Sequence, residues 1–164
     1  VANSLMIIAA KLGMAYTAVA PRELWPEEGL LNEMRETAKE TEGSITVSDS
    51  LDAVAGADAL YTDVWVSMGE ESMFGERIAL LEGYRVTMDM VQKTGNEDVI
   101  FLHCLPAFHD LNTEVGRAVY EQYGLTEMEV SDEVFRAPFS KVFDQAENRL
   151  HTIKAVMVAT IGSL

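Results

Sequence analysis

Apolar residues along this chain occur either in short strand-length runs or at helical spacing, and segments of the two kinds alternate. Strand-length apolar runs lie in "MAYTAVAP", "SITVS", "ALYTDVWV" and "VIFLHCLP". Helical spacing or helix-ending residues occur between them, and we expect helices in "NSLMIIAAKLG", residues 27–42, "SLDAVAGA", "MFGERIALLEG" and residues 112–123. The pattern therefore predicts strands that are separated by helices.

The last helical pattern is the clearest. Over residues 146–161, Leu150, Ile153, Met157 and Ile161 recur at spacings of three and four. This spacing places the four side chains on one face of a helix, where they form a single apolar stripe.

Short strands that alternate with helices indicate an α/β protein with a mostly parallel sheet covered by helices on both faces. No repeat or linker divides the chain, so we expect one domain over residues 1–164. In such sheets, ligands bind beyond the carboxyl ends of the strands. This rule selects "TDVWVSMGEE", after a strand at Ala59–Thr62, and "HCLPAFHD", after a strand at 99–102, and we expect both at one edge.

Composition and charge narrow the class of protein. The 164 residues carry a net charge of −15, so the surface repels nucleic acid. No stretch approaches the ~18 uninterrupted apolar residues of a membrane span. The single cysteine cannot form an internal disulfide, and the apolar start at residues 1–14 lacks the basic leader of a signal peptide. We therefore expect a cytoplasmic protein that binds neither nucleic acid nor membrane.

Several residues at the selected edge have ordinary structural explanations. Cys104 alone is more often a small buried apolar residue than a reactive thiol. A metal site of His103, Cys104, His109 and Asp110 is disfavoured, because adjacent strand residues point to opposite faces. Asp63 alone suggests a turn or cap, and Arg149 a solvated residue. No G-x-G-x-x-G motif follows a strand, which argues against a bound dinucleotide. Since a metal site is disfavoured as well, we expect neither a metal nor a cofactor.

Three segments taken together are more specific than any single residue. "DVWVSMG" at 63–69, "FLHCLP" at 101–106 and "FDQAENRLHTIKAVM" at 143–157 resemble, in order and spacing, the ornithine carbamoyltransferase family. The similarity runs across essentially the whole chain and is to the second, ornithine-binding domain. It implies a Rossmann-like three-layer α/β fold with a mostly parallel sheet flanked by helices.

The resemblance also implies a reaction and a set of sites. The family transfers the carbamoyl group of carbamoyl phosphate to L-ornithine, which gives citrulline and phosphate. By similarity, Asp63, Ser67 and Met68 hold ornithine, and Cys104, paired with Asp63, lies beside the reacting amine as its proton acceptor. A thiol that shares a hydrogen bond with a carboxylate resists ionisation, so a purely positional role for Cys104 is the alternative.

The remaining contacts implied by the resemblance concern the other substrate. Cys104, Leu105 and Arg149 face carbamoyl phosphate, while His103 and Pro106 support the loop that carries the first two. We expect Pro106 to bias Leu105 toward extended geometry and to leave the carbonyls of Cys104 and Leu105 unpaired.

The departures from the family pattern matter equally. The phosphate-binding segments "S-T-R-T" and "H-P-T-Q" of the family's first domain do not occur, nor does an asparagine pair that contacts ornithine. We therefore expect a piece that lacks the carbamoyl-phosphate domain, that is inactive alone, and that exposes the stripe of its last helix. In the family the complete enzyme is a homotrimer.

Two alternatives remain open. One is a paralogous carbamoyltransferase that uses putrescine, acetylated ornithine or aspartate, although aspartate enzymes carry proline at the position of Cys104. The other is a non-catalytic module that binds an amino acid.

Overall fold

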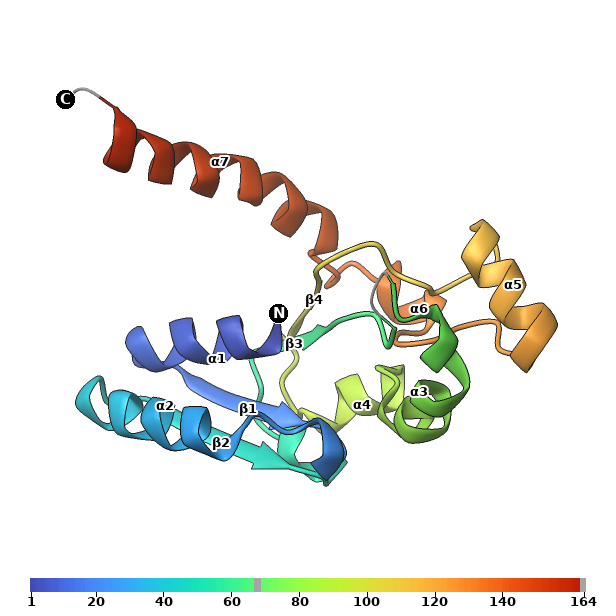
Figure 1. Ribbon diagram of the computed structural model, residues 1–164, viewed down its shortest axis with the longest axis horizontal. Coiled ribbons are helices and arrows are strands. Elements are labelled where there is room, and N and C mark those ends of the chain that lie inside the picture. Colours follow the sequence, from blue (N-terminus) through green and yellow to red (C-terminus); the bar gives the residue numbers. More distant parts are fainter. Residues whose placement is uncertain (67–68, 163–164) are drawn as a thin grey trace.

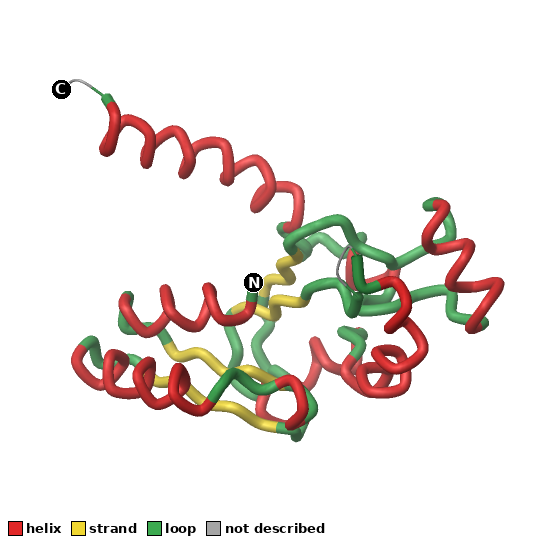
Figure 2. Tube along the Cα trace, in the orientation of Figure 1, coloured by secondary structure: helices red, strands yellow, loops and turns green. Residues whose placement is uncertain are grey.

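The computed structural model of the chain describes residues 1–66 and 69–162. Its elements alternate much as the apolar pattern predicts (Figures 1 and 2). In order they are α1 (Ala2–Lys11), β1 (Ala15–Val19), η1 (Arg22–Leu24), α2 (Glu28–Glu40), β2 (Ser44–Ser48), η2 (Leu51–Val54), β3 (Ala59–Thr62), η3 (Glu71–Met73), α3 (Phe74–Leu81), η4 (Glu82–Tyr84), α4 (Met88–Lys93), β4 (Ile100–His103), α5 (Glu114–Tyr123), α6 (Asp132–Phe135) and α7 (Val142–Ile161).

The predicted α/β class is confirmed, with parallel strands and flanking helices. The described strands form two separate parallel pairs, β1 with β2 and β3 with β4, where the sequence suggested one sheet. No described strand links β1 to β3. Ile45 and Phe101 belong to different hydrophobic clusters, and Val19 at the end of β1 packs against the cluster of Phe101. The two short helices α4 and α6 were not predicted, and α7 begins four residues earlier than the apolar pattern indicated.

The β1–β2 pair is covered on one face. Tyr16 and Ile45, which are partners in the register, pack with the buried faces of α1 and α2. The neighbouring partners Thr17 and Thr46 are exposed. The expected cover on both faces is therefore absent at these two threonines within the described residues.

The turn after α1 depends on a glycine, as the sequence suggested. Gly13 has a φ of +70°, in the left-handed region that side chains avoid. A Cβ atom at this position would also collide with the carbonyl oxygen of Thr41. Glycine therefore ends α1 where the chain passes close to the end of α2.

The β3–β4 pair is built into the larger core. Phe101 and Val130 are fully buried there, together with apolar residues of α4 and α6. Residue 140 bridges in parallel to Phe101, since Phe101 N–H donates to Phe139 O (3.1 Å) and Lys141 N–H to Phe101 O (2.9 Å). This extension of the sheet brings the first turn of α7 against β4.

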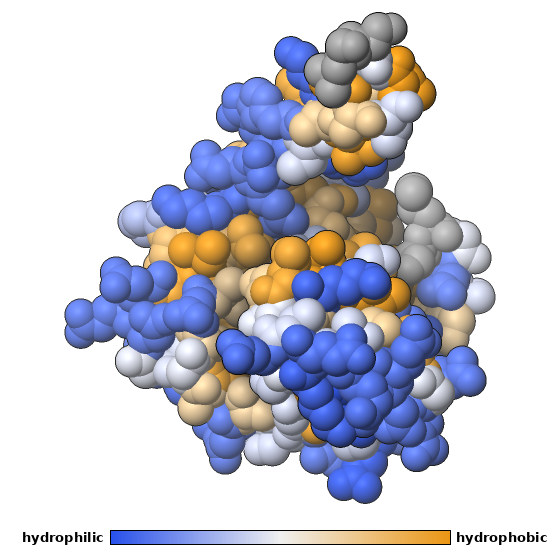
Figure 3. All heavy atoms as spheres, turned by 90° about the vertical axis from the view of Figure 1, so that its left-hand side faces the viewer, coloured by the Kyte–Doolittle hydropathy of each residue, from blue (hydrophilic) through white to orange (hydrophobic). Residues whose placement is uncertain are grey.

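Beyond its first turn, α7 projects away from the body of the molecule (Figure 1). Val142 is its only buried residue. The stripe residues Leu150, Ile153, Met157 and Ile161 expose 66%, 48%, 51% and 76% of their surface, so the predicted exposure is confirmed. Figure 3 shows hydrophobic side chains on this helix and on the body beneath it. No described helix is both long enough and apolar enough to cross a membrane.

We predict that this stripe makes the 164-residue chain self-associate, because exposed apolar area of this extent is unfavourable in water. Sedimentation should show an oligomer for the parent chain and a monomer for the double variant Ile153→Glu, Met157→Glu. The matched control is Ala155→Glu, Ala159→Glu, which puts the same charges on the other side of α7. A monomeric parent chain, or a control that dissociates equally, would contradict the prediction.

Candidate functional site

The candidate site begins where β3 and β4 end. The two strands are parallel and pair Thr62 with His103, so the next residues, Asp63 and Cys104, leave the sheet side by side. The Cys104 thiol donates a hydrogen bond to Asp63 Oδ1, with a distance of 2.8 Å between Sγ and Oδ1. The expectation that both segments open at one edge of the sheet is thus confirmed.

The environment of this pair keeps the thiol protonated. Burial, followed by the hydrogen bond and the negative charge of Asp63, raises the pKa of Cys104 to about 12. The same Oδ1 atom accepts the backbone N–H of Val64 at 2.8 Å, which holds the carboxylate in place. Burial also raises the pKa of Tyr61, with smaller effects in the same direction from Cys104 and Asp63.

The first turn of α7 fastens the start of the loop after β4. His103 N–H donates to Gln145 Oε1 (3.1 Å), and Gln145 Nε2 donates to the Tyr61 hydroxyl (3.3 Å). Gln145 thereby links both strands beside the Asp63–Cys104 pair. Its position inside "FDQAEN" was visible in the sequence, but its role was not predicted, because the link depends on how α7 packs against β4.

The conformation of Leu105 differs from the expectation. Its φ is +52°, so the prediction of an extended residue before Pro106 was wrong. The backbone N–H of Leu105 donates to His103 Nδ1 at 2.8 Å, and this bond holds Leu105 in a region that bulky residues rarely occupy. The peptide bond to Pro106 is cis, and Pro106 itself is exposed. No described residue donates a hydrogen bond to the Leu105 carbonyl.

A buried acid that the sequence analysis missed lies behind the loop. Glu129 and His103 are both without exposed side-chain surface, and His103 Nε2 lies 3.1 Å from Glu129 Oε1. The same oxygen accepts the N–H of Phe108 at 2.7 Å. The available signal was a charged residue between apolar ones in "MEV", which is unusual in a buried segment.

The other predicted site residues are less closely assembled. Ser67 and Met68 fall outside the described residues. Arg149 is exposed one turn beyond Gln145, and its guanidinium makes no hydrogen bond or ion pair with any described residue. Residues four apart share a helix face, so Arg149 and Gln145 lie on one side of α7.

The four residues weighed as a metal site do not converge. His103 contacts Glu129, and Cys104 contacts Asp63. His109 instead lies among carboxylates: its Nδ1 is 2.7 Å from Asp132 Oδ1 and 3.9 Å from Asp110 Oδ2.

A cation of the chain itself already pairs with both carboxylates of this cluster. Arg136 donates to both oxygens of Asp132 (2.8 and 3.0 Å) and to Asp110 Oδ2 (3.0 Å). Burial acts to raise the pKa of Asp132, but bonds from His109 and Arg136 lower it overall. Its contribution to stability is therefore present above the ordinary carboxyl pKa and is lost as pH falls through the lowered value.

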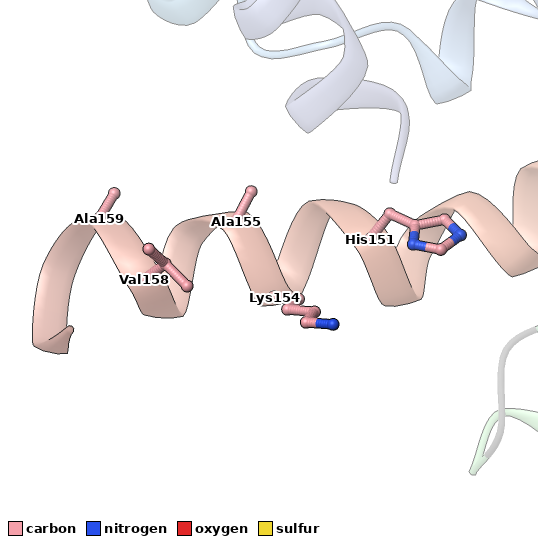
Figure 4. Close-up of a pocket in the computed structure, with 5 residues that line it drawn as sticks. All are labelled: His151, Lys154, Ala155, Val158 and Ala159. Carbon is pink, nitrogen blue, oxygen red and sulfur yellow. The ribbon is translucent and has the colours of Figure 1, made fainter.

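Two shallow hollows lie on α7, away from the Asp63–Cys104 pair. Figure 4 shows the side chains that line one of them, His151, Lys154, Ala155, Val158 and Ala159, all from α7. The apolar stripe of the same helix lines the other. The surface of a single helix cannot enclose a small molecule, so we place the substrate site at the strand ends.

Comparisons with known proteins show which family the chain resembles. The chain is 62% identical over its full length to the catabolic ornithine carbamoyltransferase of Bacillus licheniformis, of which it covers 49%. It is 57% identical to the corresponding Streptococcus gordonii protein, with the same coverage. The chain thus spans about half the length of these relatives.

A solved structure and a family model point to the same family of carbamoyltransferases. Ornithine carbamoyltransferase from Pyrococcus furiosus superposes with a TM-score of 0.82 at 38% identity, over 100% of this chain and 47% of that one. A model of the family described as aspartate/ornithine carbamoyltransferase, Asp/Orn binding domain, matches residues 1–160. The chain therefore belongs to the aspartate/ornithine carbamoyltransferase family and corresponds to its Asp/Orn binding domain.

Proposed function

We propose that this chain is the ornithine-binding half of an ornithine carbamoyltransferase, which transfers the carbamoyl group of carbamoyl phosphate to L-ornithine. The observation that carries the proposal is the contact between Cys104 Sγ and Asp63 Oδ1 at the carboxyl ends of two adjacent parallel strands. Support comes from the relatives, which bear this name at 57–62% identity. The proposed complete enzyme is a cytoplasmic homotrimer.

Asp63 is suited to an amino-acid substrate. Its carboxylate lies at the strand edge, is half-buried, and accepts hydrogen bonds from the thiol of Cys104 and the backbone of Val64. A partly desolvated carboxylate pairs strongly with an ammonium group. We assign Asp63 to the ornithine ammonium, with Ser67 and Met68 completing the amino-acid contacts.

Cys104 lies where the attacking amine would approach. The amine of ornithine must lose its proton before it attacks the carbonyl carbon, and a thiol accepts a proton only after its own has left. In the free chain the raised pKa keeps the thiol protonated. An ammonium bound at Asp63 would offset the carboxylate charge and lower the pKa of Cys104 from its raised value, while the effect of burial remains. The proton of the thiol would pass to solvent, and the thiolate would then take one proton from the ornithine ammonium and return to the thiol form.

The carbamoyl group would occupy the loop side of the pair. Leu105 leaves its carbonyl without a described donor, and a carbonyl can accept from the carbamoyl NH₂. Arg149, on the same side of α7 as Gln145, supplies a cation for carbamoyl phosphate. His103 and Pro106 shape this loop.

The test joins this chain to the half that it does not cover in the Bacillus licheniformis relative. We expect the joined protein to form citrulline from ornithine and carbamoyl phosphate, and to be much slower with putrescine, N-acetylornithine or aspartate. The isolated chain should form none, since groups that stabilise developing charge usually dominate catalysis and would lie in the other half. Circular dichroism and sedimentation must first show that the joined protein is folded.

In the joined protein, Asp63→Asn should raise the KM for ornithine about 10-fold or more, because a charge-assisted hydrogen bond contributes ~1.5–3 kcal/mol. The KM for carbamoyl phosphate should stay unchanged. Asp58→Asn, at the other end of β3, is the control. A folded joined protein without turnover, or equal losses for both substrates, would overturn the assignment.

A further prediction concerns the pH dependence of the isolated chain. With a pKa of about 12, Cys104 should react with iodoacetamide slowly at pH 8, and the rate should climb about tenfold per pH unit from there to about pH 11. In Asp63→Asn the curve should bend at lower pH, since the negative charge is lost and the amide oxygen is a weaker acceptor, while burial remains. Unchanged curves would show that Asp63 does not govern the thiol.

The raised pKa of Cys104 also makes the stability of the folded chain depend on pH. The thiol has a higher pKa in the folded chain than the ~8.5 of an unfolded one. Its contribution to stability is therefore fully present below about pH 8.5 and is lost as pH rises toward the folded value.

A further inference from the structure

Glu129 is a fully buried acid for which the proposed reaction assigns no role. The backbone around it is fixed by two bonds: Val86 N–H donates to Glu129 O (3.0 Å), and the N–H of the preceding residue, Met128, donates to Phe108 O (2.8 Å). The side chain therefore leaves a rigid part of the core and points at the loop that follows β4.

One oxygen of this side chain holds both ends of that loop. Glu129 Oε1 lies 3.1 Å from His103 Nε2 and accepts the N–H of Phe108 at 2.7 Å. Cys104, Leu105 and Pro106 all lie between these two points. The carboxylate thus fixes the span of the loop that presents Cys104 to Asp63.

The hydrogen bonds also define the state of the His103 ring. Leu105 N–H donates to Nδ1, so Nδ1 is an acceptor and the ring proton resides on Nε2, where it is donated to Glu129. Removal of Glu129 would leave Nε2–H without its acceptor. The ring could then turn and release the bond that holds Leu105 at a φ of +52°.

The second oxygen argues against a role in packing alone. Glu129 Oε2 is buried and has no hydrogen-bond partner among the described residues. Burial of an unsatisfied carboxylate oxygen is unfavourable, and an apolar residue of similar size would fill the space at lower cost. The presence of an acid at this position is therefore explained by the contacts of Oε1 with His103 and Phe108.

We propose that Glu129 is a positioning residue that acts through His103 and Phe108 to hold Cys104 against Asp63. The contact geometry belongs to the chain itself, while its importance for carbamoyl transfer rests on the proposed function. Glu129 touches neither Cys104 nor Asp63, so its effect on them is indirect.

The test uses the 164-residue chain and its only cysteine. We measure the rate of alkylation by iodoacetamide against pH for Glu129→Leu, Glu129→Gln and Val130→Ala. Glu129→Leu should raise the rate at pH 8 about 10-fold or more, because a released thiol loses both Asp63 and its burial, and each unit of pKa changes the thiolate fraction tenfold. Glu129→Gln keeps an acceptor oxygen and should stay within about threefold of the parent.

Val130→Ala is the matched control, since Val130 is the next residue, is equally buried, and makes no contact with the loop through a polar atom. It weakens the same core and should leave the pH profile unchanged. A parental profile in a folded Glu129→Leu, or an equal rise in Val130→Ala, would overturn the proposal.

A measurement on the parent chain covers the case in which Glu129→Leu fails to fold. The amide protons of Leu105 and Phe108 should exchange as slowly as that of Met128, which belongs to the fixed core segment. Fast exchange at both amides would show that the loop is not held. Neither experiment needs turnover, so this inference can fail or stand independently of the proposed reaction.

Discussion

The parallel register of β3 and β4 is the constraint on which the rest of the site depends. Because Thr62 pairs with His103, the two chains leave the sheet at the same level, and Asp63 meets Cys104 without any further device. A slip of one residue would turn each side chain to the opposite face and separate carboxylate from thiol. Phe101 anchors β4 in the core, because it is fully buried and its N–H and its carbonyl both bond the segment before α7.

The polar pair of Asp63 and Cys104 lies at the end of strands that pack into an apolar core. The core beneath β4 is made mostly of valine side chains, with leucine, methionine and phenylalanine. One histidine and one glutamate are buried beside it and pair with each other. A low-dielectric surrounding strengthens such a pair and makes its geometry exacting. Leu105 N–H bonds His103, and Phe108 N–H bonds Glu129, so this pair holds the loop after β4. The orientation of Cys104 therefore depends on the buried pair as well as on Asp63.

The sequence predicted whatever depends on local pattern. Strand runs, the stop at Gly13 and the stripe on α7 follow from periodicity and glycine chemistry, and the edge that holds Asp63 and Cys104 follows from a rule about parallel sheets. The conformation of Leu105 was beyond such rules, because a long-range chain of bonds through His103 to Glu129 overrides the local preference before proline. Gln145 and Glu129 were missed for the same reason: each acts across a sequence separation that no local pattern encodes.

The two ends of α7 show how one helix can serve two kinds of surface. At its start, Val142 is buried and Gln145 bridges β3 and β4, so this turn is part of the site. Four residues later Arg149 is solvent-exposed, and from there the helix carries an apolar stripe into open space. The hydrogen bonds from Gln145 to His103 and Tyr61 form only while the first turn of α7 packs against β4. The docking of this turn and the shape of the loop after β4 therefore depend on the same contacts, while the exposed stripe beyond Arg149 takes no part in them.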